Sequence, residues 1–250
     1  MSDHWVLTPT RNNLHLLKRA VVTFRAQDIG DIRIMIINNG STDGTGPWLH
    51  SQHDIFAVHY PGRGLSVAAS WNRGLEKLFQ KNDHVFVVNN DTELHPSTYR
   101  YLLADGGEFV TAVGTREPKK IESVEAPDPA KKRRHPDFSA YLIRRSVWEK
   151  VGPFDEKYLV AFCEDADMHL RMHRAGVDAY ALELPFLHHG SATVKNADPE
   201  EQQLIEQAAA HNRKHFLTTY GCEVGSEQYY REFNGEAPVE ETESKEVAPI

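Results

Sequence analysis

Cysteine is scarce in this 250-residue sequence, which contains only Cys163 and Cys222. Two cysteines cannot build a disulfide framework, and their separation does not match the paired spacing of a metal site. No apolar run approaches the ~20 residues of a membrane-spanning helix, and the start, Met1 to His4, lacks the charged and apolar regions of a signal peptide. These absences predict ordinary thiols and a soluble, cytoplasmic protein with no membrane span.

Positive charge is also in deficit, because the formal net charge is −8. This balance argues against indiscriminate attraction to polyanions, although a local basic patch remains compatible with it. Much of the acid lies from Asn234 onward, in a stretch that carries proline and few aromatic residues. Such a composition predicts a disordered tail.

Strand-like and helix-like segments alternate along the chain, which favours an α/β fold with a mostly parallel sheet flanked by helices. Apolar and β-branched runs predict strands at His4 to Thr8, Ile32 to Ile37, Ile55 to His59, Val85 to Val88, Phe109 to Gly114, Phe138 to Arg144 and Ala179 to Leu184. Helical spacing of apolar residues predicts helices at Asn12 to Gln27, near Pro47, Ser66 to Gln80, from Pro96, Ser146 to Val151, Glu164 to Arg174 and Pro199 to Tyr220.

Asp91 follows the buried strand Val85 to Val88, and the pattern predicts that its carboxylate points into a cleft. One or two carboxylates together with substrate phosphates are enough to bind Mg²⁺ or Mn²⁺. The simpler interpretation is that Asp91 caps the helix that begins near Pro96. Asn38 and Asn39 end another central strand, at the edge where open α/β sheets bind ligands.

Two further groups of polar residues come later in the sequence. In Glu164-Asp165-Ala166-Asp167 the two aspartates do not share a helical face, so one can face the cleft while the other holds the turn. A carboxylate beside a bound sugar can act as a general base, whereas acids that merely begin a helix interact with its dipole. His188 and His189 follow a strand, and because neighbours in a strand point oppositely, one of them at most reaches a metal.

The order of these motifs resembles glycosyltransferase family 2, whose members are inverting, nucleotide-sugar-dependent enzymes. The matching segments are Ile36 to Thr45, Asn89 to Leu94, Val151 to Glu156, Glu164 to Asp167 and His188 to Ser191. The resemblance implies a GT-A fold, with a Rossmann-like sheet and a C-terminal helix. It divides the chain into a glycosyltransferase domain at 1–222 and a C-terminal extension at 223–250, disordered from about 234.

The resemblance also implies roles for particular residues. Asp165 matches the catalytic base, Asp91 matches the last acid of the metal-binding motif, and His188 matches the histidine that completes the metal site. The residues implied in nucleotide or diphosphate contacts are Thr8, Pro9, Thr10, Asn38, Asn39, Arg63, Asn72, Asn89 and Asn90. The implied cofactor is Mn²⁺ or Mg²⁺, and the implied donor is a nucleoside-diphosphate sugar.

Some positions depart from the family pattern. Asn89 replaces the first acid of the metal motif, so the metal would depend more on the diphosphate and on His188. Asn38 stands where an acid is common, and Trp71 stands where the family often has arginine near the diphosphate. Arg63 or Arg73 is the candidate substitute for that arginine.

The leading hypothesis is a metal-dependent inverting transfer of a sugar to an acceptor hydroxyl. The charged, proline-bearing excursion from Thr115 to Asp137 includes Lys119-Lys120 and Lys131 to Arg134. It is either a solvated charge run or the binding region for an anionic acceptor: a lipid-linked glycan, an acidic glycan or a nucleic acid with an exposed base. Two alternatives stay open, a non-catalytic nucleotide-sugar-binding protein of the same fold and a nucleotidyltransferase.

Overall fold

The computed structural model describes residues 4–62, 64–128, 130–190 and 197–233. Within these ranges, no helix combines the length and the apolar character that crossing a membrane requires. The predicted disordered tail, from Asn234 onward, lies outside the described residues.

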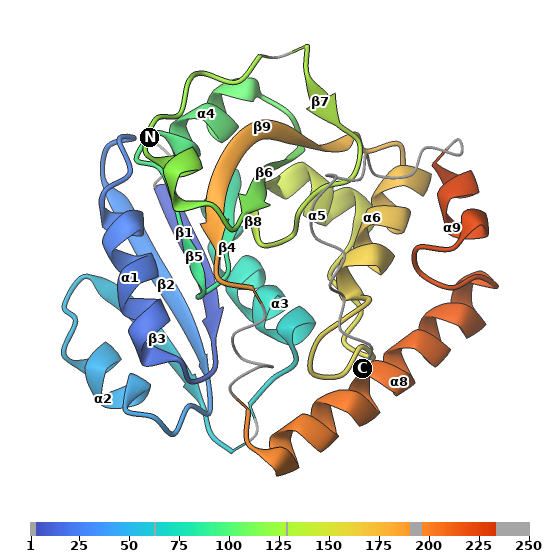
Figure 1. The fold of residues 1–250 in the computed structure, drawn as a ribbon, viewed down its shortest axis with the longest axis horizontal. Helices are drawn as coiled ribbons and strands as arrows, with labels where there is room; N and C mark the ends of the chain where they lie inside the picture. Colours follow the sequence, from blue (N-terminus) through green and yellow to red (C-terminus); the bar gives the residue numbers. More distant parts are fainter. Residues whose placement is uncertain (1–3, 63, 129, 191–196, 234–250) are drawn as a thin grey trace.

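The first half of the chain builds a parallel sheet with helices between its strands (Figure 1). Its strands are β1 (His4–Thr10), β2 (Ile32–Asn39), β3 (Ile55–Tyr60) and β4 (His84–Val88), and they stand in the order β3-β2-β1-β4. The helices are α1 (Leu14–Arg25), α2 (Thr45–His50) and α3 (Val67–Leu78). Because β2 and β4 lie on opposite sides of β1, the strand order reverses at β1, which is where open α/β sheets bind ligands.

Both faces of this sheet are covered, which explains why its strands are apolar at nearly every position. In β1, Val6 packs on one side with Phe24 of α1, whereas Leu7 packs on the other side with Leu75 of α3. Gly74 of α3 lies against Leu7 so closely that an added Cβ would fall 2.3 Å from that side chain. The alternation of neighbours across the sheet therefore fixes the register of the strand.

The second half of the chain extends the same sheet in mixed directions. It adds β5 (Thr92–Glu93), α4 (Thr98–Asp105), β6 (Phe109–Thr115), β8 (Ala140–Arg144) and α5 (Arg145–Val151). The expected parallel arrangement holds from β3 to β4 and between β6 and β9 (Ala179–His188), whereas β8 runs antiparallel to both of its neighbours. The sheet order continues from β4 as β8-β6-β9-β5.

The last strand of the sheet, β9 (Ala179–His188), continues beyond the expected end at Leu184. Proline cannot donate to a ladder, but the pairing of β9 with β6 shifts register between Thr111 and Val113, and Pro185 falls opposite Val113. The irregularity accommodates the proline, and β9 carries on to His188. The Thr115 to Asp137 excursion contains a short 3-10 helix, η1 (Pro118–Ile121), and a strand, β7 (Lys132–Arg133), which pairs with β9.

The helices described after α5 are α6 (Glu164–Arg174), α8 (Pro199–Tyr220) and α9 (Glu227–Glu232). α6 and α8 have the predicted bounds. Asp198 caps α8 by accepting from the Glu201 N–H at 2.9 Å. α9 packs into the cluster that joins α6 and α8, and Phe233 stacks on His169. Packed structure thus continues past the expected domain boundary at residue 222.

Candidate active site

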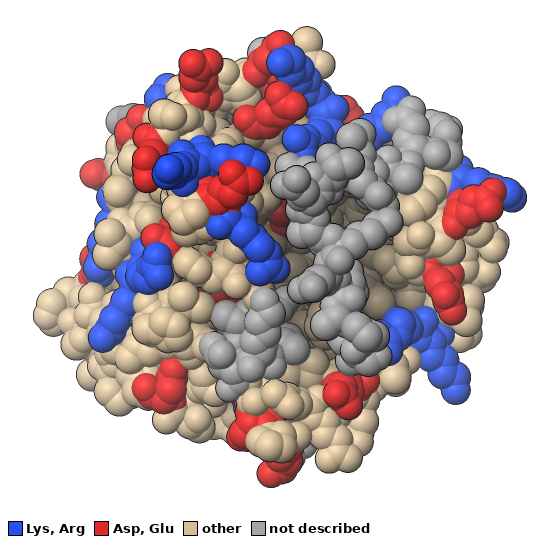
Figure 2. Space-filling model, viewed as in Figure 1, with Lys and Arg blue, Asp and Glu red and all other residues tan. Residues whose placement is uncertain are grey.

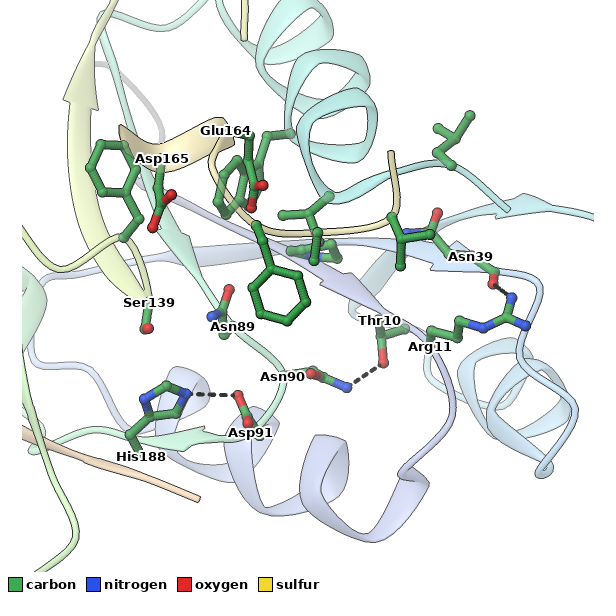
Figure 3. Close-up of a pocket in the computed structure, with 18 of the residues that line it drawn as sticks. Thr10, Arg11, Asn39, Asn89, Asn90, Asp91, Ser139, Glu164, Asp165 and His188 are labelled. Carbon is green, nitrogen blue, oxygen red and sulfur yellow. Dashed lines mark hydrogen bonds and ion pairs between the residues drawn. The ribbon is translucent and has the colours of Figure 1, made fainter. Parts of the chain in front are cut away.

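A pocket of about 560 Å³ opens at the carboxyl ends of β1, β2 and β4 (Figure 3). The segment before α6 and the first residues of α6 form its facing wall. The lining residues are Pro9, Thr10, Arg11, Asn39, Leu65, Val67, Trp71, Asn89, Asn90, Asp91, Pro136, Asp137, Phe138, Ser139, Val160, Ala161, Phe162, Glu164, Asp165, His188 and Ile205. The pocket therefore lies at the point where the strand order reverses.

Asp91 and His188 meet at one end of the pocket, where 3.4 Å separates Asp91 Oδ1 from His188 Nε2. The short antiparallel pairing of β5 with β9 brings them together, because Thr92 lies opposite His188. Burial on its own would lower the pKa of His188, but the hydrogen bond and the charge of Asp91 outweigh it and raise that pKa. Asp91 is buried, so a carboxylate and an imidazole face the cavity as a close pair.

His189 points away from the pocket, as the alternation along a strand requires. Its Nε2 lies 2.6 Å from Glu93 Oε1, and Arg19 pairs with the same carboxylate at 2.6 Å. The sequence left the choice between His188 and His189 open, and the structure puts only His188 among the pocket residues.

Several of the residues expected to contact the nucleotide line the pocket: Pro9, Thr10, Asn39, Asn89 and Asn90. Two of them are held by side-chain hydrogen bonds, because the Asn90 Nδ2 group donates to Thr10 Oγ1 at 2.9 Å and Asn39 Nδ2 donates to Ser70 Oγ of α3 at 2.6 Å. These bonds fix the polar residues at the ends of β1, β2 and β4 along the cavity wall.

Other residues expected in these contacts lie elsewhere. The Thr8 side chain is fully buried in β1, and Asn38 contacts His59, with 3.1 Å between Asn38 Nδ2 and His59 Nδ1. The Asn72 amide binds the backbone of Phe154, accepting from its N–H and donating to its carbonyl, both at 2.9 Å. Arg63 lies outside the described residues.

Of the two predicted substitutes for the missing family arginine, Arg73 alone lies within the described residues. Arg73 pairs with Glu156 on the surface, and Arg63 is not described. Trp71 packs against Phe154 at 4.8 Å between ring centroids. The pocket instead contains Arg11, which donates to the Asn39 carbonyl at 2.9 Å and forms an ion pair with Glu201 of α8.

Three polar atoms of the pocket residues are buried and have no hydrogen-bond partner among the described residues. They are Asn39 Oδ1, Trp71 Nε1 and Glu164 Oε2. Buried polar groups are paired in most folded proteins, which makes these three atoms exceptions. Each is shielded from solvent, so a ligand in the cavity would reach it only after a side-chain shift.

The facing wall brings two carboxyl groups to the pocket from the first turn of α6. Figure 3 shows Glu164 and Asp165 projecting from one side toward Asn89, Asp91 and His188 on the other. Asp167 lies outside the pocket, because it accepts from Arg171 Nε at 2.7 Å and from the Tyr220 hydroxyl at 2.6 Å. Asp165 therefore lies at the cleft and Asp167 holds the helix, as the helical spacing predicts.

Burial makes both of these pocket carboxyls weaker acids. Desolvation, followed by repulsion from Asp165, raises the pKa of Glu164 to about 8. Desolvation also raises the pKa of Asp165, although the Ala166 N–H donates to its Oδ1 at 2.7 Å and opposes the shift. The Asp165 side chain is exposed and lines the pocket. A carboxylate with a raised pKa is a better proton acceptor.

Asp137 is a pocket residue that the sequence did not indicate. Its carboxylate accepts from the Gly114 N–H at 3.0 Å and from the Ser139 N–H at 2.9 Å, which holds it between β6 and β8. Its negative charge contributes to the raised pKa values of both Asp165 and His188. No local motif marks Asp137, because it ends an excursion that has no regular pattern.

Part of the charge in the Thr115 to Asp137 excursion is neutralised within the protein. Lys132 lies 3.8 Å from the Tyr180 ring and 3.9 Å from Asp105, and both Lys131 and Arg133 lie 4.0 Å from Glu183. Figure 2 shows basic and acidic side chains interspersed on the face viewed. These contacts favour a largely structural role for Lys131 to Arg133.

The fold is GT-A, as the comparison with solved structures shows. Mannosyltransferase PcManGT from Pyrobaculum calidifontis, in complex with GDP-Man and Mn²⁺, has a TM-score of 0.58 and 16% identity, covering 92% of this chain and 68% of that chain. S. aureus TarS has a TM-score of 0.56 and 13% identity over 92% and 47% of the two chains. GalNAc-T7 with UDP, GalNAc and Mn²⁺ has a TM-score of 0.58 and 10% identity over 75% and 44%.

The sequence comparison defines the family. The model of glycosyl transferase family 2 matches residues 5–163, and this chain belongs to that family. A curated relative, N-acetylglucosaminyl-diphospho-decaprenol L-rhamnosyltransferase of Mycobacterium tuberculosis (strain CDC 1551 / Oshkosh), is 24% identical over 76% of this chain and 73% of its own. The protein is therefore a glycosyltransferase that uses nucleotide sugars.

Proposed function

We propose that this protein moves a sugar from a nucleoside-diphosphate sugar to an acceptor hydroxyl, with a divalent metal ion and with inversion at the anomeric carbon. The observation that carries the proposal is the arrangement of Asp91 and His188 across one pocket from Asp165. A diphosphate bound at Asp91 and His188 and an acceptor bound at Asp165 would meet within the cavity.

The residues at the diphosphate end fit Mn²⁺ or Mg²⁺. Asp91 supplies a carboxylate and His188 an imidazole, 3.4 Å apart, and the described residues contain no group of three or more acidic, histidine or cysteine ligands. Such a two-residue site depends on phosphate oxygens to complete the coordination, consistent with Asn89 at the position of the first acid. When bound, the ion would neutralise charge on the leaving diphosphate. The solved structures of PcManGT and GalNAc-T7 both contain Mn²⁺.

The donor's nucleotide would lie along the ends of β1 and β2. Asn39 lines the cavity there, and Thr10 and Asn90 fix the floor between β1 and β4. Arg11 lies beside them with its guanidinium on the Asn39 carbonyl. A cation at this position favours a bound diphosphate.

Asp165 is the proposed general base. It takes the proton of the acceptor hydroxyl while that oxygen bonds to the anomeric carbon and the bond from this carbon to the diphosphate oxygen breaks. The acceptor attacks from the side of α6, opposite the diphosphate, so the configuration inverts. A positioned general base contributes about 10²–10⁴-fold to the rate.

The proposed acceptor is anionic, with a lipid-linked sugar diphosphate as the first candidate. The name of the mycobacterial relative includes such an acceptor. Arg116, exposed at the end of β6, is close enough to influence the pKa of His188 and packs against Gly190, where an added Cβ would lie 2.6 Å from the guanidinium. Binding of an anionic acceptor would weaken steeply with salt, whereas a neutral saccharide would show a flat dependence.

The test is a thermal-shift screen of nucleotide sugars with and without Mn²⁺, followed by transfer assays of the best donor. Ligands that bind the native state raise the apparent melting temperature. We expect one class of nucleotide sugar to stabilise the protein in a metal-dependent manner, and Asp165→Asn and Asp91→Ala to lose transfer. Full transfer by both variants would end the assignment.

A further inference from the structure

The segment that leads into α6 has an unusual backbone. Val160, Phe162 and Cys163 have φ angles of 56°, 83° and 70°, in the left-handed region that favours glycine. β-branched Val160 is especially disfavoured there. Residues 159–163, called here the α6 entry segment, also contribute Val160, Ala161 and Phe162 to the pocket wall. A conformation of this kind persists only where the surroundings impose it.

Asn212, in the middle of α8, makes the contacts that impose it. Its Oδ1 accepts from the Leu159 N–H at 2.8 Å, and its Nδ2 group donates to the carbonyls of Leu159 and Ala161 at 2.8 Å and of Phe162 at 3.0 Å. The Asn212 side chain is fully buried. One amide thus binds almost the whole length of the α6 entry segment.

A second contact joins the same segment to the donor side. The Val67 N–H, at the start of α3, donates to the Val160 carbonyl at 2.7 Å. α8 itself is fixed at both ends, because Glu201 pairs with Arg11 beside the pocket and the Tyr220 hydroxyl donates to Asp167 of α6. The long helix in Figure 1 therefore connects the floor of the pocket, the α6 entry segment and α6.

We propose that Asn212 is a positioning residue for sugar transfer: it holds the α6 entry segment in its left-handed conformation and so sets Asp165 in place across from the diphosphate end. This inference rests on the proposed function. In these contacts Asn212 binds only backbone groups. It therefore acts on Asp165 indirectly, through the segment that precedes Glu164.

The effect of Asn212 on the α6 entry segment can be tested without a substrate. Hydrogen–deuterium exchange is measured on Asn212→Ala, on Asn212→Asp, which keeps the volume and an acceptor oxygen but cannot donate as a carboxylate, and on the control Asn82→Ala. Asn82 is a buried asparagine outside the pocket whose Nδ2 group donates to the Leu78 carbonyl at 2.7 Å. For Asn212→Ala we expect at least about tenfold faster exchange at Leu159 and in the first turn of α6, because local opening no longer breaks these bonds. For Asn212→Asp, whose remaining oxygen can still accept from the Leu159 N–H, we expect the acceleration in the first turn of α6.

Unchanged exchange in that region in both Asn212 variants, or an equal acceleration there in Asn82→Ala, would overturn the inference. The comparison with Asn82→Ala separates local release of the segment from general loss of stability.

Kinetics with the donor from the thermal-shift screen test the consequence. We expect kcat to fall about 10²-fold in both Asn212 variants while the donor KM stays within twofold, because a displaced base slows the chemical step and leaves donor contacts intact. Asn82→Ala should keep both constants. A kcat retained in the Asn212 variants would contradict the positioning role. Absence of transfer by the wild-type protein would instead refute the proposed function. The exchange result would still decide whether Asn212 holds the α6 entry segment.

Discussion

The diphosphate side of the pocket consists of side chains at the ends of β1, β2 and β4, whereas the facing side consists of turns and the first residues of α6. Thr10 and Asn39 lie on strands, so the hydrogen bonds of the sheet hold their backbones, and the Asp91 carbonyl accepts from the His189 N–H at 2.9 Å. The α6 entry segment lacks a ladder and is held by Asn212 of α8 together with the Val67 N–H.

This difference in construction predicts a difference in function. The strand ends keep their arrangement without a substrate, so variants there should change donor or metal binding. Contacts with residues far along the chain set the geometry of the facing side. Variants there should therefore change the chemical step more than donor binding. The following predictions examine that division, beginning with the largest expected effect.

Asp165→Asn should lower kcat by about 10²–10⁴-fold with little change in donor affinity, since the amide cannot accept the acceptor's proton. The matched control is Asp167→Asn on the same helix. Asp167 pairs with Arg171 and lies outside the pocket, so its substitution should lower the melting temperature and leave kcat within about threefold. Single-turnover rates and calorimetric donor titration measure both. Equal losses of kcat in the two variants would remove the distinction between the two aspartates.

His188→Ala should weaken Mn²⁺-dependent donor binding by at least about tenfold, the loss that even indirect metal contacts produce. His189→Ala removes the contact with Glu93 instead, so it should lower stability by about 1 kcal/mol and keep the metal dependence. Thermal shifts with and without Mn²⁺ distinguish the two. A normal metal response in His188→Ala would exclude this histidine from the metal site.

Glu164→Gln should stabilise the protein by about 4 kcal/mol near pH 8, with the gain vanishing near pH 4. The pKa of Glu164 is about 8 in the folded protein, above its usual 4.5. As pH rises between these values the unfolded chain releases the proton and the folded protein keeps it, so the wild type loses stability. Below pH 4.5 both states are protonated and the loss is absent. Urea unfolding from pH 4 to pH 8 measures it, and a gain independent of pH would contradict the raised pKa.

Asn89→Asp should tighten Mn²⁺ binding by about tenfold, because a second carboxylate would join Asp91 and His188 in the pocket. Asn89 is fixed by its backbone N–H, which donates to the Ser139 carbonyl at 2.9 Å, so the substitution keeps the local conformation. Titration of the metal in the presence of a nucleoside diphosphate would detect the change. Unaltered affinity would indicate that the Asn89 side chain lies too far from the ion.

The diphosphate side is also the part that the sequence predicts well. Apolar runs identify β1, β2 and β4, and polar residues placed directly after them necessarily gather at one edge of a parallel sheet. The same logic explains the errors there. Asn38 and Asn39 were both expected to contact the nucleotide, but neighbours in a strand alternate, and Asn39 alone lines the pocket.

The facing side could be predicted only in part. The bounds of α6 and the placement of Asp165 follow from helical spacing, since acids begin the helix and Asp167 points elsewhere. Asp137 and Asn212 leave no local signal, because their roles come from partners far along the chain such as Gly114 and Leu159. The short strands β5 and β7 were missed for the same reason, as each exists through its pairing with β9.

The central claim is that the diphosphate and its metal ion bind at Asp91 and His188, across the pocket from Asp165. A crystal structure with Mn²⁺ and the nucleoside diphosphate of the preferred donor tests it most directly, through the anomalous signal of manganese. The account predicts one strong peak within coordination distance of an Asp91 carboxylate oxygen and His188 Nε2, with Asp165 facing the diphosphate. A manganese peak away from both residues, with the diphosphate bound outside this pocket, would contradict it.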